Sequence, residues 1–296
     1  MTNQKLKIYG DNNKKISIMS STAQFALNVF EGIRVYKTKN GFNIFRAKDH
    51  LKRLLESAEG LYLNHDYSLD MLENILYCFV EDLNLKGDTA LRVILAVTDE
   101  GSWSSSNNAN LFIIPSARPH MSSIQIGAKR LCVVKWQRIS SLSMPPHIKC
   151  GANYINSRLG FFEARHKGFD YPIFINSKGF VSESSGACIV LIKGKKLMTP
   201  PIDADILNSI TRDCIKNMAS ILDFEWIEKD LEKGELLDAD EAFLCGTAAE
   251  ITPIGSIDDK LFGSGGVGLR TQKISDLYEK IVRNQTTVFI EWNHEI

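Results

Sequence analysis

The sequence predicts a mixed α/β (α+β) fold of two domains, and three observations lead to this prediction. With 296 residues, of which 44% are hydrophobic, the chain is long enough to bury two cores. Its apolar residues recur with periods of two and of 3.6 residues, which indicates both strands and helices. Segment 116–127 interrupts both periods with Pro, Ser and Gly. We therefore expect an N-terminal α/β domain over 1–118, a linker over 119–127 and a larger C-terminal domain over 128–296.

The expected elements follow from local patterns. Asn40-Gly41 is typical of a tight turn and predicts a hairpin between two flanking strands. Leu51, Leu54 and Ala58 share one face of a helix. The polar segment 99–110 is expected to be a mobile loop. The predicted strands are 30–36, 43–45, 89–97, 110–115, 130–136, 171–176, 180–181, 188–192 and 241–245, and the predicted helices are 49–61, 68–85, 153–168, 210–222 and 268–283.

Composition excludes some classes of function. Lys and Arg total 35, as do Asp and Glu, so no net charge attracts the chain to nucleic acid or to an anionic membrane. The six cysteines are scattered without a CxxC motif, so we expect reduced thiols and no metal site. Residues 1–5 lack the apolar core of a signal peptide, and no apolar run reaches the ~18 residues that span a bilayer. A cytoplasmic protein acting on small molecules is expected.

Lys149 is the first candidate for chemistry. It is followed by Cys150-Gly151-Ala152, whose small residues should leave room for a lysine side chain to swing. A lysine that is unhindered and loses its proton near neutral pH can form an imine with an aldehyde. By itself this means little, because most lysines are solvated surface groups.

Two further side chains suit a pyridine cofactor with a phenolate oxygen. Tyr154 follows the lysine by five positions and could donate to the phenolate. Glu183, just after a predicted strand, could keep a pyridine nitrogen protonated, which makes the ring an electron sink. Simpler roles are a core tyrosine and a carboxylate that caps a turn. The combination favours pyridoxal phosphate (PLP).

Three segments could hold the phosphate of such a cofactor. Ser209-Ile210-Thr211 opens a predicted helix, where amide groups and the helix dipole attract anions. The turn Gly246-Thr247-Ala248-Ala249 follows a buried strand and could form an anion-binding nest. Arg53 offers a guanidinium fork. The simpler explanations are that Ser209 is only an N-cap and that Arg53 is one of many helix-surface arginines.

Taken together, these segments resemble the fold-type IV (class IV) PLP-dependent aminotransferases, and most of all the branched-chain amino acid aminotransferases. The resemblance covers about residues 25 to 280. The segments that carry it are Val29-Phe30-Glu31-Gly32-Ile33-Arg34, His50-Leu51-Lys52-Arg53-Leu54, Ile148 to Asn156, Glu183, Ile210-Thr211-Arg212-Asp213 and Gly246-Thr247-Ala248-Ala249-Glu250-Ile251-Thr252-Pro253.

The resemblance implies a role for each matching residue. Lys149 would form the internal aldimine and shuttle a proton during catalysis, Glu183 would pair with the pyridine nitrogen, and Tyr154 with the phenolate. Leu207 would lie against the ring. The phosphate would be held by Arg53, Ile210, Thr211 and Thr247. The substrate would be met by Phe30, Gly32, Arg34, Arg92 and Ala248, with Arg92 receiving an acidic side chain. The resemblance also implies a homodimer.

Several positions depart from the branched-chain pattern. Phe25 and Ala90 stand where those enzymes carry tyrosines that help build the substrate pocket. Cys188 replaces an asparagine, and Ala152 replaces a second glycine. Because polar contacts discriminate strongly among substrates, the pocket is expected to differ from a branched-chain one.

Three hypotheses about function follow. The first is an aminotransferase that moves an amino group from a donor amino acid, with glutamate favoured by Arg92, to a keto acid or carbonyl compound. D-amino acids or amines are alternative donors in the same fold. The second is a lyase resembling aminodeoxychorismate lyase. The third, a non-catalytic scaffold, is opposed by the full set of cofactor contacts.

Overall fold

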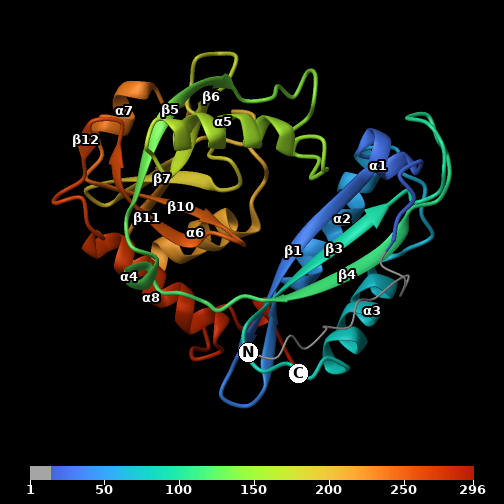
Figure 1. Cartoon of the computed structure of the whole chain (residues 1–296). Coiled ribbons are helices and arrows are strands. Elements are labelled where there is room, and N and C mark those ends of the chain that lie inside the picture. Colours follow the sequence, from blue (N-terminus) through green and yellow to red (C-terminus); the bar gives the residue numbers. More distant parts are fainter. Residues whose placement is uncertain (1–14) are drawn as a thin grey trace. The chain divides into compact units, whose positions relative to one another are not determined.

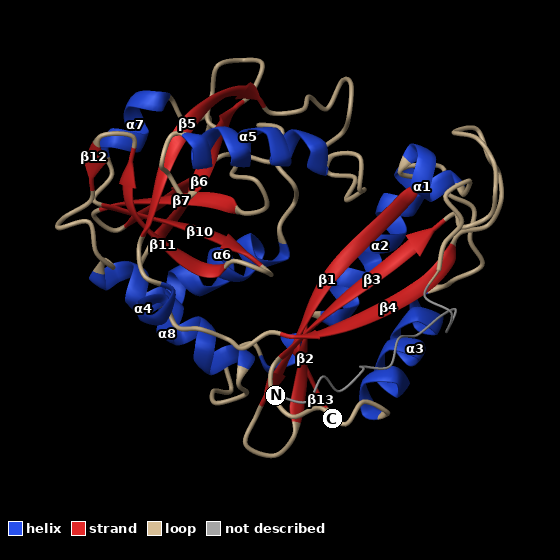
Figure 2. Cartoon of the chain, in the orientation of Figure 1, coloured by secondary structure: helices blue, strands red, loops and turns tan. Residues whose placement is uncertain are grey.

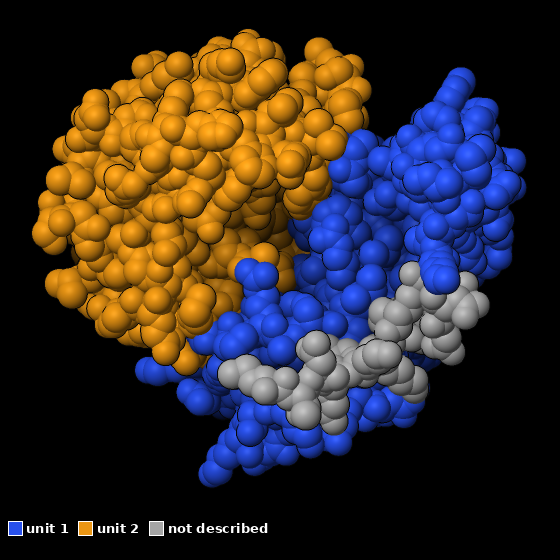
Figure 3. Space-filling model, in the orientation of Figure 1, with its two compact units in different colours: residues 1–120, 148–152, 280–296 blue, residues 121–147, 153–279 orange. Residues whose placement is uncertain are grey.

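The computed structural model describes residues 15–296, which form two compact units (Figure 3). One comprises 15–120, 148–152 and 280–296, and the other comprises 121–147 and 153–279. Residues 1–5, on which the expectation about a signal peptide rests, lie outside the described part.

This division differs from the predicted domains, which placed everything from 128 onward in one C-terminal domain. Segment 148–152, with the candidate lysine, belongs to the first unit because Ile148 and Cys150 are buried in its hydrophobic core. The C-terminal residues belong there because β13 (Asn293–Glu295) pairs with β2 (Phe42–Phe45). The predicted linker over 119–127 contains a short helix, α4 (Ser123–Ile126), and a capping box of Ser122 and Gln125 caps its N-terminus.

The first unit is built on an antiparallel sheet with strand order β13-β2-β1-β3-β4. Figure 1 labels β1, β3 and β4 of this sheet. The hairpin predicted around Asn40-Gly41 joins β1 to β2, with Val35 opposite Ile44. The other elements of this unit are β1 (Asn28–Lys37), β3 (Thr89–Ala96), β4 (Asn110–Ala117), α1 (Ser21–Phe25), α2 (Ala47–Gly60), α3 (Leu69–Glu81) and a short 3₁₀ helix (Ile290–Trp292).

Alternation along β1 decides which side chains enter the core of the first unit. Ile33 and Val35 are fully buried in that core, together with Leu51 and Leu54 of α2. Because successive residues of a strand point to opposite faces, Phe30, Gly32 and Arg34 belong to the other face of the sheet. The leucine stripe that predicted α2 is therefore the stripe that packs on the sheet.

The second unit is built on a mixed sheet with strand order β6-β5-β11-β10-β7-β8-β9, and β12 pairs with β11 (Figure 2). Helix α5 packs on β5 and β6, and α6 packs on β9 and β10. The elements are β5 (Lys129–Gln137), α5 (Tyr154–His166), β6 (Tyr171–Ile175), β7 (Cys188–Lys193), β8 (Lys196–Thr199), α6 (Ile210–Ile221), β9 (Glu225–Glu228), α7 (Lys233–Asp238), β10 (Glu241–Gly246), β11 (Glu250–Ile257), β12 (Lys260–Leu261) and α8 (Leu269–Val282).

Two details of this unit differ from the sequence prediction. The strand expected at 180–181 is only an isolated bridge between Val181 and Ile175. Strand β11 was not predicted, although all of its residues are buried between β10 and β5. Among the residues that the structure describes, no helix has the length and apolar character needed to cross a bilayer.

Candidate active site

Lys149 is fixed at its backbone on both sides within the first unit. Its N–H donates to Ser57 Oγ on α2 at 3.1 Å, and its carbonyl accepts from the N–H of Phe30 on β1 at 3.0 Å. The side chain is half-buried, and its Nζ lies 4.9 Å from the centroid of the Phe30 ring. The amine is thus presented on the β1 face that bears the predicted substrate residues.

Gly151 serves a purpose other than the predicted one. We expected it to leave room for the lysine side chain, but a Cβ at this position would lie 2.8 Å from Asn28 Oδ1. The glycine therefore admits the side chain of Asn28, whose amide donates to Thr22 Oγ1. A methyl group here would push Asn28 away from the lysine segment.

The predicted substrate residues of β1 and β3 form one patch of the sheet face. Gly32 pairs in register with Arg92, and Arg34 pairs with Ala90. The Arg92 guanidinium lies 3.7 Å from the Phe30 ring centroid, a cation–π contact that fixes its direction. A Cβ on Gly32 would meet no atom within 4 Å, so the strand leaves open space beside Arg92.

Arg34 differs from its neighbours on this face because its side chain is buried, with 2% exposed. Its Nη2 donates to the carbonyl of Arg118 at 2.8 Å, and its guanidinium lies 5.0 Å from the ring centroid of Tyr36. The structure therefore gives Arg34 a set of contacts within the protein. Its predicted role toward substrate stays a prediction.

Arg53, predicted to hold phosphate, uses two of its nitrogens on a carboxylate. Its Nε and Nη2 donate to the two oxygens of Glu31 at 2.6 and 2.8 Å, and His50 Nδ1 lies 2.8 Å from the same carboxylate. Burial raises the pKa of Glu31, but the charge of Arg53 and the hydrogen bond from His50 outweigh it and hold that pKa well below its usual range. Burial lowers the pKa of His50, so the imidazole is neutral at pH 7.

Glu183 is a buried carboxylate of the second unit, with 3% exposed. Its Oε1 accepts from Arg138 Nη2 at 2.6 Å and from the N–H of Leu207 at 3.2 Å. Its Oε2 faces the thiol of Cys188 at 3.9 Å. Burial raises the pKa of Cys188 well above its usual range, so the thiol stays protonated and can donate. Glu183 is thus more than the turn cap that the simpler explanation allowed.

Arg138 is a residue of this site that the sequence did not predict. Besides Glu183, it donates to Asn156 Oδ1 and to the carbonyl of Asp205, both at 3.3 Å. Asn156 lies in the first turn of α5, which begins at Tyr154. Tyr154 is 36% exposed, so it is not a core tyrosine. The sequence feature that could have indicated Arg138 is a basic residue directly after a predicted strand, because a buried carboxylate requires a partner.

The predicted phosphate seat lies at the start of α6. Ser209 caps the helix, and its side chain accepts from the N–H of Arg212 at 3.2 Å. The simpler explanation, that Ser209 is an N-cap, is therefore correct. The amides of Ile210 and Thr211 belong to the first turn, where backbone N–H groups have no acceptor inside the helix. Leu207 connects this seat to Glu183 through its backbone N–H.

The turn with Thr247 and Ala248 reaches the same region of the second unit. Cys245 of β10 pairs in register with Cys188 of β7, so the turn after β10 lies beside the segment that follows Glu183. A Cβ on Gly246 would lie 3.3 Å from the carbonyl of Gly186, which shows how close the two segments are. Within the second unit, Glu183 therefore contacts Leu207 just before α6, and the segment after Glu183 runs beside the turn after β10.

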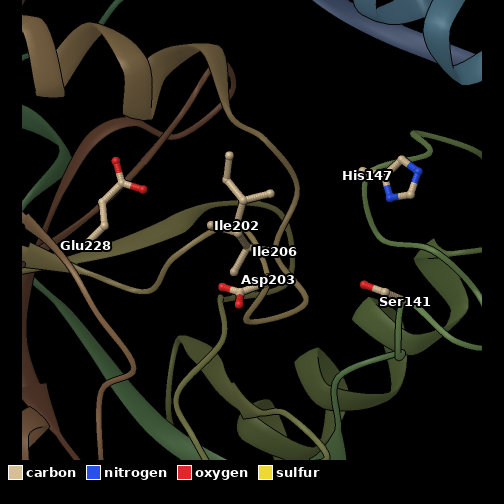
Figure 4. Close-up of a pocket in the computed structure, with 6 residues that line it drawn as sticks. All are labelled: Ser141, His147, Ile202, Asp203, Ile206 and Glu228. Carbon is tan, nitrogen blue, oxygen red and sulfur yellow. The ribbon is translucent and has the colours of Figure 1, made fainter.

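A cavity of about 400 Å³ opens on the second unit (Figure 4). It is lined by Ser141, His147, Ile202, Asp203, Ile206 and Glu228, none of which is a predicted site residue. Their polar groups lie apart in Figure 4 and do not converge on one point. In the described part of the chain, no group of three His, Cys, Asp or Glu side chains could hold a metal ion.

Comparison with known proteins shows the family to which the chain belongs. The model of the amino-transferase class IV family matches residues 28–257. A probable branched-chain-amino-acid aminotransferase of Aquifex aeolicus is 32% identical over 293 residues, covering 97% of this chain and 93% of the relative. The branched-chain-amino-acid aminotransferase of Escherichia coli K12 is 32% identical over 279 residues, covering 92% and 89%.

Solved structures agree as well. The branched-chain aminotransferase of Thermoproteus uzoniensis with norvaline has a TM-score of 0.89 at 32% identity, covering 98% of both chains. The PLP form of the Thermobaculum terrenum branched-chain enzyme has a TM-score of 0.89 at 32% identity, covering 95% of this chain and 93% of that one. The chain belongs to the class IV aminotransferases. It is an enzyme of the PLP-dependent kind, with the fold-type IV architecture.

The residues present fit this cofactor. A buried carboxylate, Glu183, is available for a protonated ring nitrogen, and the first turn of α6 is available for a phosphate. Lys149 supplies a tethered primary amine. The fit rests on the chemistry of these donor and acceptor groups, each held by contacts within its own unit.

Proposed function

We propose that the enzyme transfers an amino group from a donor amino acid, with glutamate as the favoured donor, to a keto acid or carbonyl acceptor at Lys149. The observation that carries the proposal is the tether of Lys149 to Ser57 and Phe30, which presents its amine on the β1 face beside Arg92. When bound, PLP supplies an aldehyde that takes up the amino group and a ring that draws electrons from the substrate Cα.

The chain's own residues divide the remaining work. Lys149 would hold the cofactor through Nζ, and its amine would serve as the base that takes the proton from the substrate Cα and moves it on during transfer. Glu183 would keep the ring nitrogen protonated, and the contact from Arg138 holds that carboxylate in place. Tyr154 would donate to the phenolate oxygen.

The resemblance assigns the phosphate to Arg53 of the first unit and, in the second unit, to the start of α6 and the turn after β10. Ile210, Thr211 and Thr247 would supply amide or hydroxyl donors, and Leu207 would pack against the ring. A dianion at the first turn of α6 is stabilised by the helix dipole.

Substrate choice is assigned to the face of the first sheet. Arg92 stacks on Phe30 and presents a guanidinium beside the open space over Gly32, which suits a donor that ends in a carboxylate. Phe25 is 41% exposed and Ala90 is half-buried. Both lack the hydroxyls of the branched-chain pattern, so a pocket with altered preference is proposed.

One alternative is a transaminase for D-amino acids or amines, which the altered pocket would permit. A lyase is disfavoured, because the family and the relatives named above are aminotransferases. A donor added alone separates the two reactions. A transaminase converts the cofactor to its pyridoxamine form and releases one equivalent of keto acid, whereas a lyase returns to the aldehyde form and keeps releasing product.

The first experiment is a half-reaction on purified enzyme with glutamate, followed by ultraviolet–visible absorbance. Borohydride reduction and mass spectrometry then locate the adduct, which we expect on Lys149. The Lys149→Ala variant should show neither conversion nor adduct. Lys195→Ala, which changes a lysine with 77% of its side chain exposed, should behave as the parent does. An adduct on another lysine, or turnover in Lys149→Ala, would contradict the assignment.

We further propose a cytoplasmic homodimer that uses small molecules and binds neither nucleic acid nor membrane. The resemblance to class IV aminotransferases supports the dimer, and the absence of net charge supports the lack of attraction to polyanions. Sedimentation equilibrium of the purified chain tests the first statement, and a monomer at micromolar concentration would contradict it.

A further inference from the structure

We propose that Glu31 and His50 are positioning residues that hold the Arg53 guanidinium in the one orientation from which it receives the cofactor phosphate. This inference rests on the proposed function and deepens it, because it assigns a role to two residues that do not touch the cofactor. Both residues lie in the first unit, as does Arg53.

The Glu31 carboxylate holds the Arg53 guanidinium with two hydrogen bonds. Glu31 Oε1 accepts from Arg53 Nε at 2.6 Å, and Oε2 accepts from Arg53 Nη2 at 2.8 Å and lies 2.8 Å from His50 Nδ1. The side chains of Glu31 and His50 are 0% and 2% exposed. Because an ionised carboxylate only accepts, His50 Nδ1 carries the hydrogen and donates it. Two bonds to a planar guanidinium fix both its position and its plane.

Glu31 occupies a position where charge is costly. It faces the core side of β1, in the same alternation as Val29 and Ile33, which are fully buried in the hydrophobic core. Desolvation of a buried ion pair offsets much of its attraction, so apolar residues of similar size at these positions would give comparable stability. Stability alone therefore does not explain why a carboxylate, an imidazole and a guanidinium meet here.

The same helix face that carries this cluster also holds the candidate lysine. His50, Arg53 and Ser57 are spaced three and four residues apart on α2, so they lie along one stripe. Ser57 Oγ accepts the N–H of Lys149 at 3.1 Å. One rigid helix thus sets both the amine and the guanidinium.

The Glu31→Gln variant tests the inference, because it keeps the shape of the side chain but replaces one of the two acceptor oxygens by an NH₂ donor, so the two-oxygen contact with the guanidinium is lost. The readout is the ratio of dissociation constants for PLP and for pyridoxal, which lacks the phosphate, measured by equilibrium dialysis of enzyme freed of cofactor. We expect PLP to bind about tenfold or more weakly, with pyridoxal unchanged.

Two other roles of Glu31 predict different results. If the carboxylate acted only through its negative charge, its removal would favour the phosphate, and PLP would bind more tightly. If Glu31 were only structural, both ligands would lose affinity equally or neither would change. Each of these results would overturn the inference.

The first control uses another carboxylate–guanidinium pair of the first unit. Asp88 and Arg283 of the first unit form another two-bonded pair, at 2.5 and 2.8 Å, and Asp88→Asn should leave the ratio unchanged. His50→Gln, which is measured alongside in case Glu31→Gln does not fold, should lower PLP affinity in the same direction. An unchanged ratio in that variant would also overturn the inference.

Borohydride trapping on the parent enzyme separates the inference from the function on which it rests. Absence of a Lys149 adduct in the parent would reject the proposed function. An adduct with an unchanged ratio in the variants would reject only the positioning role.

Discussion

Replacing Arg138 by Met should destabilise the second unit strongly, because it leaves a buried carboxylate without its guanidinium. Arg138 Nη2 lies 2.6 Å from Glu183 Oε1, and the two side chains are 7% and 4% exposed. Breaking a buried ion pair on one side costs about 3–5 kcal/mol of unfolding free energy. The lost bonds to Asn156 and Asp205 each add on the order of 1 kcal/mol or less, so the unpaired charge dominates.

Urea unfolding followed by tryptophan fluorescence measures this change. Lys195→Met, which breaks an ion pair whose side chains are 77% and 80% exposed, should cost about 0–1 kcal/mol. The double variant Arg138→Met/Glu183→Gln should recover most of the loss, because no charge then remains buried. A cost under about 1 kcal/mol for Arg138→Met, or no recovery in the double variant, would refute this reasoning.

Three further predictions concern acid, packing and substrate. Burial raises the pKa of Glu228, but hydrogen bonds from an indole N–H and from Arg212 outweigh it and lower that pKa to about 2 from 4.5. The contribution of the Glu228 carboxylate to stability is therefore full above pH 4.5 and is lost as the pH falls toward 2. Acid unfolding of the Glu228→Gln variant should lack this loss of stability between pH 4.5 and 2. Gly160→Ala would place a methyl group on the buried Phe174 ring, and urea unfolding should show a loss of about 1–3 kcal/mol. Arg92→Ala should lower kcat/KM for glutamate more than for an apolar donor, and equal losses would contradict its role.

Local patterns predicted the elements whose burial follows a simple period. Helix α2 was expected at 49–61 and is found at Ala47–Gly60, because Leu51 and Leu54 form the stripe that packs on the sheet. Strand β11 was missed because it contains Pro253 and Gly255, residues that normally indicate turns. Pairing with β10 on one side and β5 on the other overrides that local preference.

Candidate site residues were found where a short motif carries the signal. Ser209 begins a helix, and Glu183 follows a strand beside small residues, so local chemistry marked both. Arg138 was missed because its partner lies 45 residues away, and the role of Glu31 was missed because Arg53 lies 22 residues away. Sequence spacing reveals partners within a helix or a turn, but it does not reveal which strand will bring a carboxylate to a distant guanidinium.

The two missed pairs share a physical logic. Glu31 with Arg53, and Glu183 with Arg138, are buried carboxylate–guanidinium pairs, one in each unit, with both carboxylates less than 5% exposed. Such pairs add little net stability compared with apolar packing, yet each is costly to break from one side. In each pair, one residue had already been assigned to the cofactor from the sequence. This residue is Arg53 in the first pair and Glu183 in the second. A charge that is already fixed at a site from which water is excluded does not have to reorient when an ionic ligand binds. This advantage offsets the free-energy cost of desolvating the charge.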